Sequence, residues 1–191
     1  MKDLNKLAQQ IYEANKAKGF HEVKHSSEHM LCLVISELME AVEADRKNRK
    51  ADLKTFEEFM GGVKDKHYDI MYAKCFKEFI KDAVEDELAD AVIRLLDTAG
   101  ALEMRLEKID KDNNFDYLAT KDGFKKHSFT ENVFHIVDRY FRSSENVNYR
   151  LSRMIFHIEI LCEVLNIDLW KHVELKLKYN SLRPYKHGKK Y

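Results

Sequence analysis

The chain has 191 residues, in which 33 Lys and Arg balance 33 Asp and Glu, so its formal net charge is zero. This balance gives no support for binding to a nucleic acid polymer or to an anionic membrane, because both favour a basic excess. Charged residues make up 35% of the chain. No apolar run approaches the roughly 18 residues that a membrane span needs, so we expect a soluble protein.

The N-terminus and the cysteines indicate the compartment. Residues 1–5 contain no apolar stretch typical of a signal peptide, so we expect a cytoplasmic protein. Cys32, Cys75 and Cys162 are odd in number, lie far apart and form no C-x-x-C motif, which argues against a disulfide framework and against a zinc site. We therefore expect reduced cysteines, most of them buried.

The chain has only one Pro and six Gly, the residues that usually mark the turns of β-rich and loop-rich folds. This scarcity and the helical spacing of apolar side chains predict an all-α fold, a bundle of about six to eight helices in one domain over residues 1–191. Helices are predicted over residues 4–17, 28–46, 82–108, 129–142, 146–165 and 168–182.

Two segments interrupt this regular pattern. Residues 50–80 contain short helical patterns broken by a pair of glycines, and we interpret them as an inserted segment of one or two helices. Residues 109–128 are polar and aperiodic, which predicts the longest loop of the chain. Ser128 followed by Glu131 resembles a capping box and predicts the start of the next helix.

Glu37 and Glu40 form the first pair of candidate site residues. They are three residues apart, so on a helix both carboxylates project from one face and one ion can contact both. Apolar residues follow almost the whole circumference of this helix, so the pair should be at least partly buried. Burial of ionised carboxylates is unfavourable by several kcal/mol unless a cation or donors compensate it, and a bound cation meets that need.

Glu87 and Asp90 repeat this spacing in the helix predicted over residues 82–108. Here the pair belongs to a polar stripe with Arg94 and Asp97, a pattern that by itself describes a surface helix. Taken alone, each of the two pairs also fits an ordinary solvated helix face. Two facing helices that each offer two carboxylates would form an all-oxygen cage, which Mg²⁺ or Mn²⁺ prefers and zinc does not.

The C-terminal residues form a basic cluster. Lys176, Asn180 and Arg183 recur at helical spacing on one face of the last predicted helix, and Lys186 and Lys189 follow immediately. Lys and Arg bind phosphate oxygens, with Arg183 suited to a bidentate contact, and the Asn180 amide both donates and accepts hydrogen bonds. A solvated, frayed basic terminus is the alternative interpretation of the same residues.

The combination of these motifs resembles the MazG-like all-α nucleoside triphosphate pyrophosphatases, a superfamily that includes dimeric dUTPases and dCTP pyrophosphatases. The likeness lies in Glu37-x-x-Glu40, in Glu87-x-x-Asp90 and in a closing motif, Lys176-x-x-x-Asn180-x-x-Arg183-Pro184, with the basic residues behind it. It covers about half of the chain, namely residues 4–46, 82–105 and 166–191.

The resemblance implies a helical bundle that binds Mg²⁺, with Mn²⁺ as a substitute, and hydrolyses an NTP or a dNTP to the monophosphate and pyrophosphate. It implies that the metal ligands, which would also carry catalysis, are Glu37, Glu40, Glu87 and Asp90. It implies that the substrate-binding residues are Lys176, Asn180, Arg183, Lys186 and Lys189. A homodimer or a higher homo-oligomer is implied as well.

Other functions remain open from the residues alone. A non-catalytic helical protein that binds a nucleotide or a metal in regulation is the main alternative, and a purely structural bundle is another. A ferritin-like di-iron site is disfavoured, because it needs two Glu-x-x-His motifs and the chain has one, at Glu22 and His25. His135 and His157 lie on predicted amphipathic helices and are interpreted as core or boundary residues.

Overall fold

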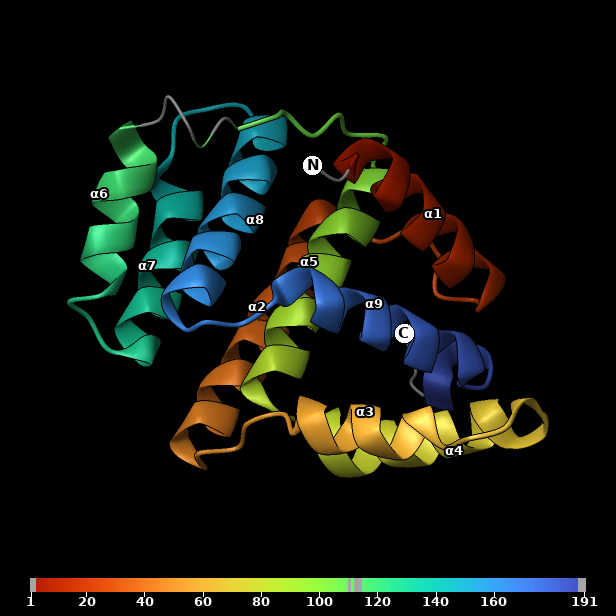
Figure 1. Cartoon of the computed structure of the whole chain (residues 1–191). Helices are drawn as coiled ribbons and strands as arrows, with labels where there is room; N and C mark the ends of the chain where they lie inside the picture. The colour runs from red at the N-terminus through yellow and green to blue at the C-terminus, as the bar shows by residue number, and fades with distance from the viewer. Residues whose placement is uncertain (1–2, 110, 112–114, 189–191) are drawn as a thin grey trace.

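The structure, a computed structural model, describes residues 3–109, 111 and 115–188. These residues form nine α-helices, with two 3₁₀ turns and one π-helical turn, and contain no strand (Figure 1). The α-helices are α1 (Leu4–Ala17), α2 (Ser27–Arg46), α3 (Leu53–Gly61), α4 (Tyr68–Cys75), α5 (Val84–Ala101), α6 (Phe115–Phe124), α7 (Phe129–Arg142), α8 (Val147–Val164) and α9 (Leu169–Leu182). The prediction of an all-α bundle is confirmed.

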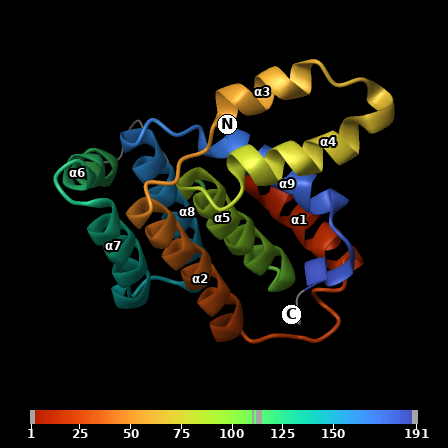
Figure 2. The same ribbon diagram turned by 90° about the horizontal axis from the view of Figure 1, so that it is seen from below.

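Helix α5 is the centre of the bundle. It packs against α1, α2, α8 and α9, and Figure 2 shows α1 and α2 on either side of it. Leu88, Leu95 and Leu96 on this helix are completely buried in the main core. Gly100 allows the close approach of α1, because a Cβ at this position would lie 2.7 Å from the carbonyl oxygen of Ala8.

Capping residues set the starts of several helices. Asp3, Ser26 and Asp168 each accept hydrogen bonds from backbone amides of the first turn that follows them. The predicted capping box is present, because the Ser128 hydroxyl accepts from the amide of Glu131 at 3.3 Å while the Glu131 carboxylate accepts from the amide of Ser128 at 2.8 Å. The sequence therefore places these helix starts within a residue or so.

Helices α6, α7 and α8 form a group at one side of the bundle, and α6 corrects one prediction. The segment 109–128 is not one long loop, because Phe115–Phe124 is helical. Tertiary contacts on α8 support this short polar helix: the Tyr117 hydroxyl donates to Glu163 at 2.7 Å, the Lys121 ammonium donates to Glu163 at 2.9 Å, and Phe124 is buried. Local periodicity does not report such contacts.

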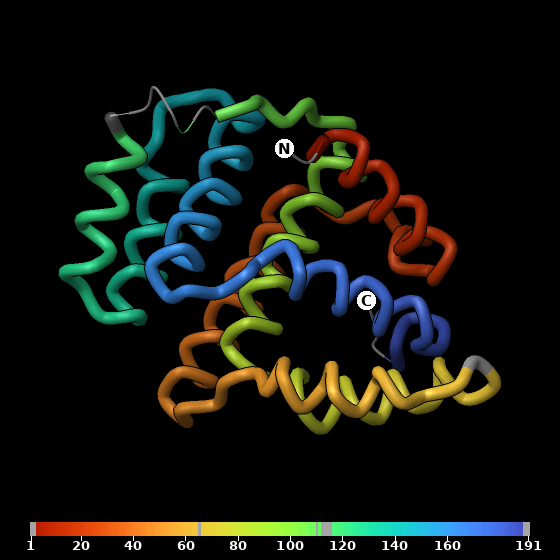
Figure 3. Tube along the Cα trace, viewed as in Figure 1, coloured from red at the N-terminus to blue at the C-terminus, as the bar shows by residue number. Residues whose placement is uncertain are grey.

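Residues 50–80 fold into the predicted helices. In Figure 3, α3 and α4 lie below α9, and α4 packs against both α3 and α9. A π-helical turn (Phe76–Ile80) then leads toward α5. This segment has an apolar cluster of its own with α9, in which the rings of Phe76 and Tyr179 stack with centroids 4.4 Å apart. That the segment is an insertion stays a prediction.

The helix predicted over residues 82–108 is shorter than expected, because α5 ends at Ala101. Glu103 adopts a left-handed backbone conformation with φ 52°, and the amide of Met104 donates to the carbonyl of Ala99 at 2.8 Å. This backbone closure ends the helix although Leu102 continues the apolar stripe.

The expectation that most cysteines are buried is confirmed. All three cysteines are free, with Cys75 and Cys162 buried and Cys32 exposed. Within the described ranges, no helix has both the length and the apolar character that crossing a membrane requires.

Candidate metal centre

The packing of α2 on α5 brings three of the four predicted carboxylate ligands together. Glu37 of α2 and Glu87 and Asp90 of α5 each offer one oxygen, and these oxygens lie within 4.8 Å of one another. Glu37 and Glu87 are 5% and 4% exposed, so one member of each predicted pair points inward. We call these three residues the acidic centre.

Glu87 is the least compensated member of the acidic centre. Among the described residues, its carboxylate makes no hydrogen bond and no ion pair. Burial raises the pKa of Glu87 to about 9, and the neighbouring carboxylate of Asp86 adds to the rise. A buried carboxylate without a donor is a site that a cation would stabilise.

Glu37 has a cationic partner from the opposite helix. The guanidinium Nε of Arg94 donates to Glu37 Oε1 at 3.0 Å. Burial and the charge of Asp90 raise the pKa of Glu37, and Arg94 opposes that rise. Arg94 thus fixes one oxygen of Glu37 and leaves the other for a further ligand.

Lys176 of α9 is buried beneath the acidic centre, at 4% exposure. Its ammonium contacts both oxygens of Asp86, at 2.8 and 2.7 Å, and Asp90 Oδ2 at 2.8 Å. Burial works to lower the pKa of Lys176, but Asp90 and Asp86 more than offset it and hold the pKa above its ordinary value. Lys176 is therefore an internal counter-ion and does not lie at the surface where the basic cluster was expected.

If every group around the acidic centre is ionised, as when a metal is bound, the protein charges there do not balance. With all groups ionised, Glu37, Glu87 and Asp90 together with Asp86 carry four negative charges, whereas Arg94 and Lys176 supply two positive ones. The remaining two negative charges equal the charge of one divalent cation. An all-oxygen donor set with this deficit fits Mg²⁺ or Mn²⁺.

Glu40, the fourth predicted ligand, lies outside the acidic centre. Its side chain is exposed and accepts a hydrogen bond from the Ser36 hydroxyl at 3.4 Å. It is close enough to Glu37 to contribute to the raised pKa of that residue. The structure thus places it at the edge of the acidic centre.

The predicted substrate-binding residues are only partly brought together. Asn180 and Arg183 line a cavity of about 40 Å³ with Asp90 and Arg94, which connects them to the acidic centre. Arg183 donates to the carbonyl of His187 at 3.3 Å. Lys189 lies outside the described residues.

The residues after α9 dock against the loop between α1 and α2. Lys186 forms an ion pair with Glu22 at 2.6 Å, and the Tyr185 hydroxyl donates to the same carboxylate. Gly19 allows this docking, because its φ is +85° and a Cβ there would lie 2.2 Å from the Tyr185 ring. We call residues 185–188 the C-terminal strap, and its His187 lines the small cavity.

Sequence reasoning missed several polar groups of this region. Asp86 was overlooked, although its spacing of four residues from Asp90 places both on one helix face. Asp97 was assigned to a solvated stripe, but it is 5% exposed and its carboxylate lies 2.9 Å from His21 Nε2. The stripe on α5 faces other helices, which helical spacing alone does not reveal.

A second group of carboxylates meets the same distance criterion. Asp82, Asp86 and Glu87 each offer an oxygen within 4.8 Å of the others. Asp86, however, already accepts hydrogen bonds from Lys176 and, at 3.0 Å, from the amide of Asp82. The acidic centre is therefore the stronger candidate for a metal.

Comparisons with known proteins add no assignment: no protein-family model matches the chain, and neither a curated protein nor a solved structure matches it significantly.

Proposed function

We propose that this protein is a Mg²⁺-dependent nucleoside triphosphate pyrophosphohydrolase, which converts an NTP or a dNTP to the monophosphate and pyrophosphate. The observation that carries the proposal is the buried acidic centre, in which the Glu87 carboxylate has no partner among the described residues. The motif resemblance to MazG-like pyrophosphatases supplies the reaction, and the adjacency of Asn180 and Arg183 to Asp90 supports a nearby phosphate site.

In this proposal Glu37, Glu87 and Asp90 hold the metal. A bound Mg²⁺ would offset charge on the phosphate oxygens and lower the pKa of a water molecule. Arg94 orients Glu37 through its 3.0 Å hydrogen bond, and Lys176 fixes Asp90 at 2.8 Å. Both cations thereby preorganise the carboxylates, which reduces the rearrangement needed on binding.

Substrate access requires a local movement. The cavity of about 40 Å³ beside Asp90 has room for about one water molecule and not for a triphosphate. His187 of the C-terminal strap lines this cavity, and Glu22 holds the strap at the surface through Tyr185 and Lys186. We propose that the strap shifts when the substrate binds and that Arg183 and Lys186 are then available to phosphate oxygens.

The experiment is a product analysis with purified protein. A panel of standard and modified NTPs and dNTPs is incubated with Mg²⁺ or with EDTA, and nucleotides and phosphates are separated chromatographically. We expect monophosphate and pyrophosphate only with Mg²⁺, and a loss of at least about 100-fold in kcat/KM for Glu87→Gln.

Glu43→Gln is the matched control for this experiment. Glu43 lies on α2, as Glu37 does, but it faces the surface and pairs with Arg46 at 2.8 Å and Lys47 at 3.2 Å. Its loss should leave turnover unchanged. Hydrolysis that persists in EDTA, or that falls equally in both variants, would contradict the proposed function.

A regulatory metal- or nucleotide-binding protein is the second candidate. The narrow cavity beside Asp90 favours it, because a site that closes on one ion needs no room for a substrate. This candidate predicts no turnover of any nucleotide in the product analysis and a higher thermal unfolding midpoint with Mg²⁺ than with EDTA. We also propose the homo-oligomer that the resemblance implies. Light scattering on protein eluted from a size-exclusion column measures the mass that tests it.

A further inference from the structure

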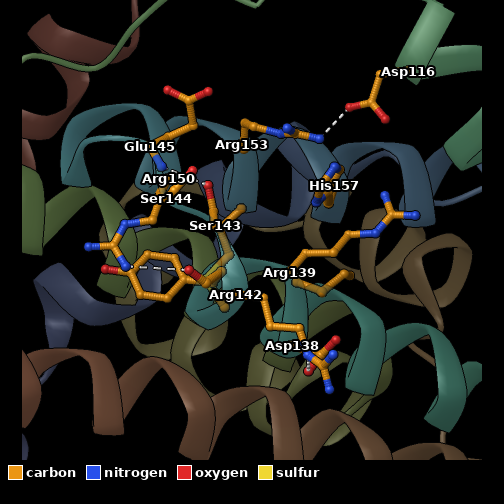
Figure 4. Close-up of a pocket in the computed structure, with 13 residues that line it drawn as sticks. Asp116, Asp138, Arg139, Arg142, Ser143, Ser144, Glu145, Arg150, Arg153 and His157 are labelled. Carbon is orange, nitrogen blue, oxygen red and sulfur yellow. Dashed lines mark hydrogen bonds and ion pairs between the residues drawn. The ribbon is translucent and has the colours of Figure 1, made fainter.

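A basic pocket lies between α7 and α8, on elements that the acidic centre does not use. It has a volume of about 470 Å³, and its lining includes Arg139, Arg142, Arg150, Arg153 and His157 (Figure 4). Helical spacing produces the cluster, because Arg139 and Arg142 are three residues apart on α7 and Arg150 and Arg153 are three apart on α8. We call this site the arginine pocket.

Two of the four arginines have carboxylate partners. Arg142 Nε donates to Asp138 at 2.6 Å, and the Arg153 guanidinium pairs with Asp116. Figure 4 shows the Arg142 guanidinium directed toward Asp138, whereas Arg139, Arg153 and His157 lie on the same side of the pocket.

The other two arginines have only neutral acceptors among the described residues. Arg139 donates to the Thr120 hydroxyl at 2.9 Å. Arg150 donates to the carbonyl of Tyr140 at 3.5 Å and lies over the Tyr140 ring, 5.0 Å from its centroid. The pocket therefore carries an excess of positive charge.

His157 provides an independent indication that the pocket takes a ligand. It is 2% exposed, it lines the pocket, and its Nε2 atom has no hydrogen-bond partner in the described structure. The Nε atom of Arg150, which lines the same pocket, is also buried without a partner. Buried polar atoms are usually satisfied, so two unsatisfied nitrogens in one pocket indicate missing hydrogen-bond partners.

The electrostatics around His157 show which protonation state it has. Burial lowers the pKa of His157 to about 3, and the nearby charges of Arg139 and Arg153 add to the lowering while Asp116 opposes it. The ring is therefore neutral at physiological pH. A neutral imidazole with its proton on Nε2 donates a hydrogen bond to an acceptor in the pocket.

We propose that the arginine pocket binds the phosphate group of a small phosphorylated molecule, with Arg139, Arg153 and His157 as donors to the phosphate oxygens. Guanidinium groups match the geometry of phosphate and form strong, charge-assisted hydrogen bonds with it. A volume of about 470 Å³ lies in the range of small-molecule sites, so the rest of the ligand fits as well.

A small ligand suits the surroundings better than a nucleic acid strand. The exposed carboxylate of Glu145 lines the pocket, and Asp138 lies on its lining as well. These carboxylates would repel a continuous phosphate backbone, and the whole chain has no net positive charge. The proposal does not rest on the proposed pyrophosphohydrolase activity.

The test is isothermal titration calorimetry in EDTA at fixed ionic strength, so that the acidic centre holds no divalent ion. The probes are inorganic phosphate, adenosine monophosphate and glucose 6-phosphate, with adenosine and glucose as unphosphorylated matches. We expect saturable binding of one molecule per chain for at least one phosphorylated compound, competition by inorganic phosphate, and no binding of the unphosphorylated matches.

Two variants on α7 give a matched comparison. Arg139→Gln should weaken binding at least tenfold. Arg142→Gln removes the same charge from an arginine whose guanidinium is directed toward Asp138 and away from Arg153 and His157 (Figure 4), so it should change binding less than twofold. Glu87→Gln should leave the affinity unchanged. Circular dichroism and thermal unfolding establish that the variants are folded. Arg139→Lys, which keeps the positive charge, should keep part of the affinity.

Several results would overturn the proposal. These are the absence of saturable binding by the wild-type protein, equal losses in Arg139→Gln and Arg142→Gln, and a loss in Glu87→Gln, which would assign binding to the acidic centre. Tighter binding of a single-stranded oligonucleotide than of every small phosphorylated probe, abolished by Arg139→Gln, would instead identify a nucleic acid site.

Discussion

The acidic centre and the arginine pocket share one sequence pattern, but the side chains that form it carry opposite charges. Each places like-charged side chains three residues apart on two helices that pack together. The acidic centre is buried in the bundle, and Arg94 and Lys176 supply part of the counter-charge. The arginine pocket lies nearer the surface, and Asp116 and Asp138 neutralise half of its arginines. The charge that remains indicates the sign of the ligand.

The two regions also respond to pH in opposite directions. Ionisation of Glu87 is disfavoured in the folded state. Glu87 therefore lowers the free energy of unfolding progressively as the pH rises from 4.5 toward about 9. Protonation of His157 is disfavoured in the folded state. His157 therefore lowers the free energy of unfolding progressively as the pH falls from 6.5 toward about 3. Each region therefore destabilises the folded protein in the pH range in which its uncompensated group would be charged.

The largest expected effect comes from removing the internal counter-ion of the acidic centre. Lys176→Met leaves Asp86 and Asp90 buried without their ammonium partner, so we expect the free energy of unfolding to fall by about 3 to 5 kcal/mol. Urea unfolding at pH 7 measures the change.

Lys171→Met is the control for this variant on the same helix. Lys171 forms an ion pair with Glu57 at 3.0 Å in which both side chains are substantially exposed, so its loss should change stability by less than about 1 kcal/mol. Similar losses in the two variants would mean that Lys176 does not act as a buried counter-ion.

A change at Glu87 should act in the opposite direction. Glu87→Gln removes a carboxylate whose pKa is raised to about 9, so without divalent cations it should increase stability at pH 8 by about 1 to 3 kcal/mol. The gain should disappear near pH 4, where the carboxyl group is neutral in both folded and unfolded chains. Urea unfolding at both pH values, with Glu43→Gln as the surface control, measures it.

The pH response of the arginine pocket provides a smaller effect. His157→Gln removes a group that is neutral when folded and protonated when unfolded below pH 6.5. The wild-type protein should therefore lose about 1 to 2 kcal/mol more stability than the variant between pH 7 and pH 5. Parallel pH profiles of the two proteins would show that His157 is not held neutral by its surroundings.

The smallest expected effect concerns the C-terminal strap, whose His187 lines the cavity beside the acidic centre. Gly19→Ala introduces a Cβ against the Tyr185 ring at a φ of +85°, so we expect a loss of about 1 kcal/mol. The amide of Lys186, which donates to the Lys18 carbonyl at 2.9 Å, should exchange its hydrogen faster. Gly123→Ala, where a Cβ meets nothing within 4 Å, should leave that exchange unchanged.

The sequence predicts most helices because their apolar periodicity and their caps are local. Asp168 and Ser128 are capping residues that the chain shows directly. Helix α6 could not be found in this way, because long-range bonds from Tyr117 and Lys121 to Glu163 support it. The end of α5 was missed for a related reason, since a left-handed residue, Glu103, is not evident from hydrophobicity.

The sequence predicts most of the acidic residues of the candidate site, but it does not predict where the cationic side chains lie. The spacing identifies Glu37, Glu87 and Asp90, but the exposed position of Glu40 depends on how α2 is rotated against α5. The burial of Lys176 depends on where α9 crosses α5. Such relative placements of helices are not encoded in the spacing within one helix.

The arginine pocket has a signal in the sequence. Arg139 and Arg142, followed by Arg150 and Arg153, repeat the three-residue spacing that singled out the carboxylate pairs. What the sequence lacks is the information that α7 and α8 pack with these faces together. His157 was interpreted as a core or boundary residue, and it is buried, with its unsatisfied nitrogen at the pocket.

The most direct test of the acidic centre is the thermal unfolding midpoint of wild-type protein and of Glu87→Gln, each with Mg²⁺ and with EDTA. We predict that Mg²⁺ raises Tm by several degrees in the wild-type protein and has little effect in the variant, because binding to the native state alone stabilises it. An equal response of both proteins to Mg²⁺, or none in either, would contradict a divalent cation site at Glu37, Glu87 and Asp90.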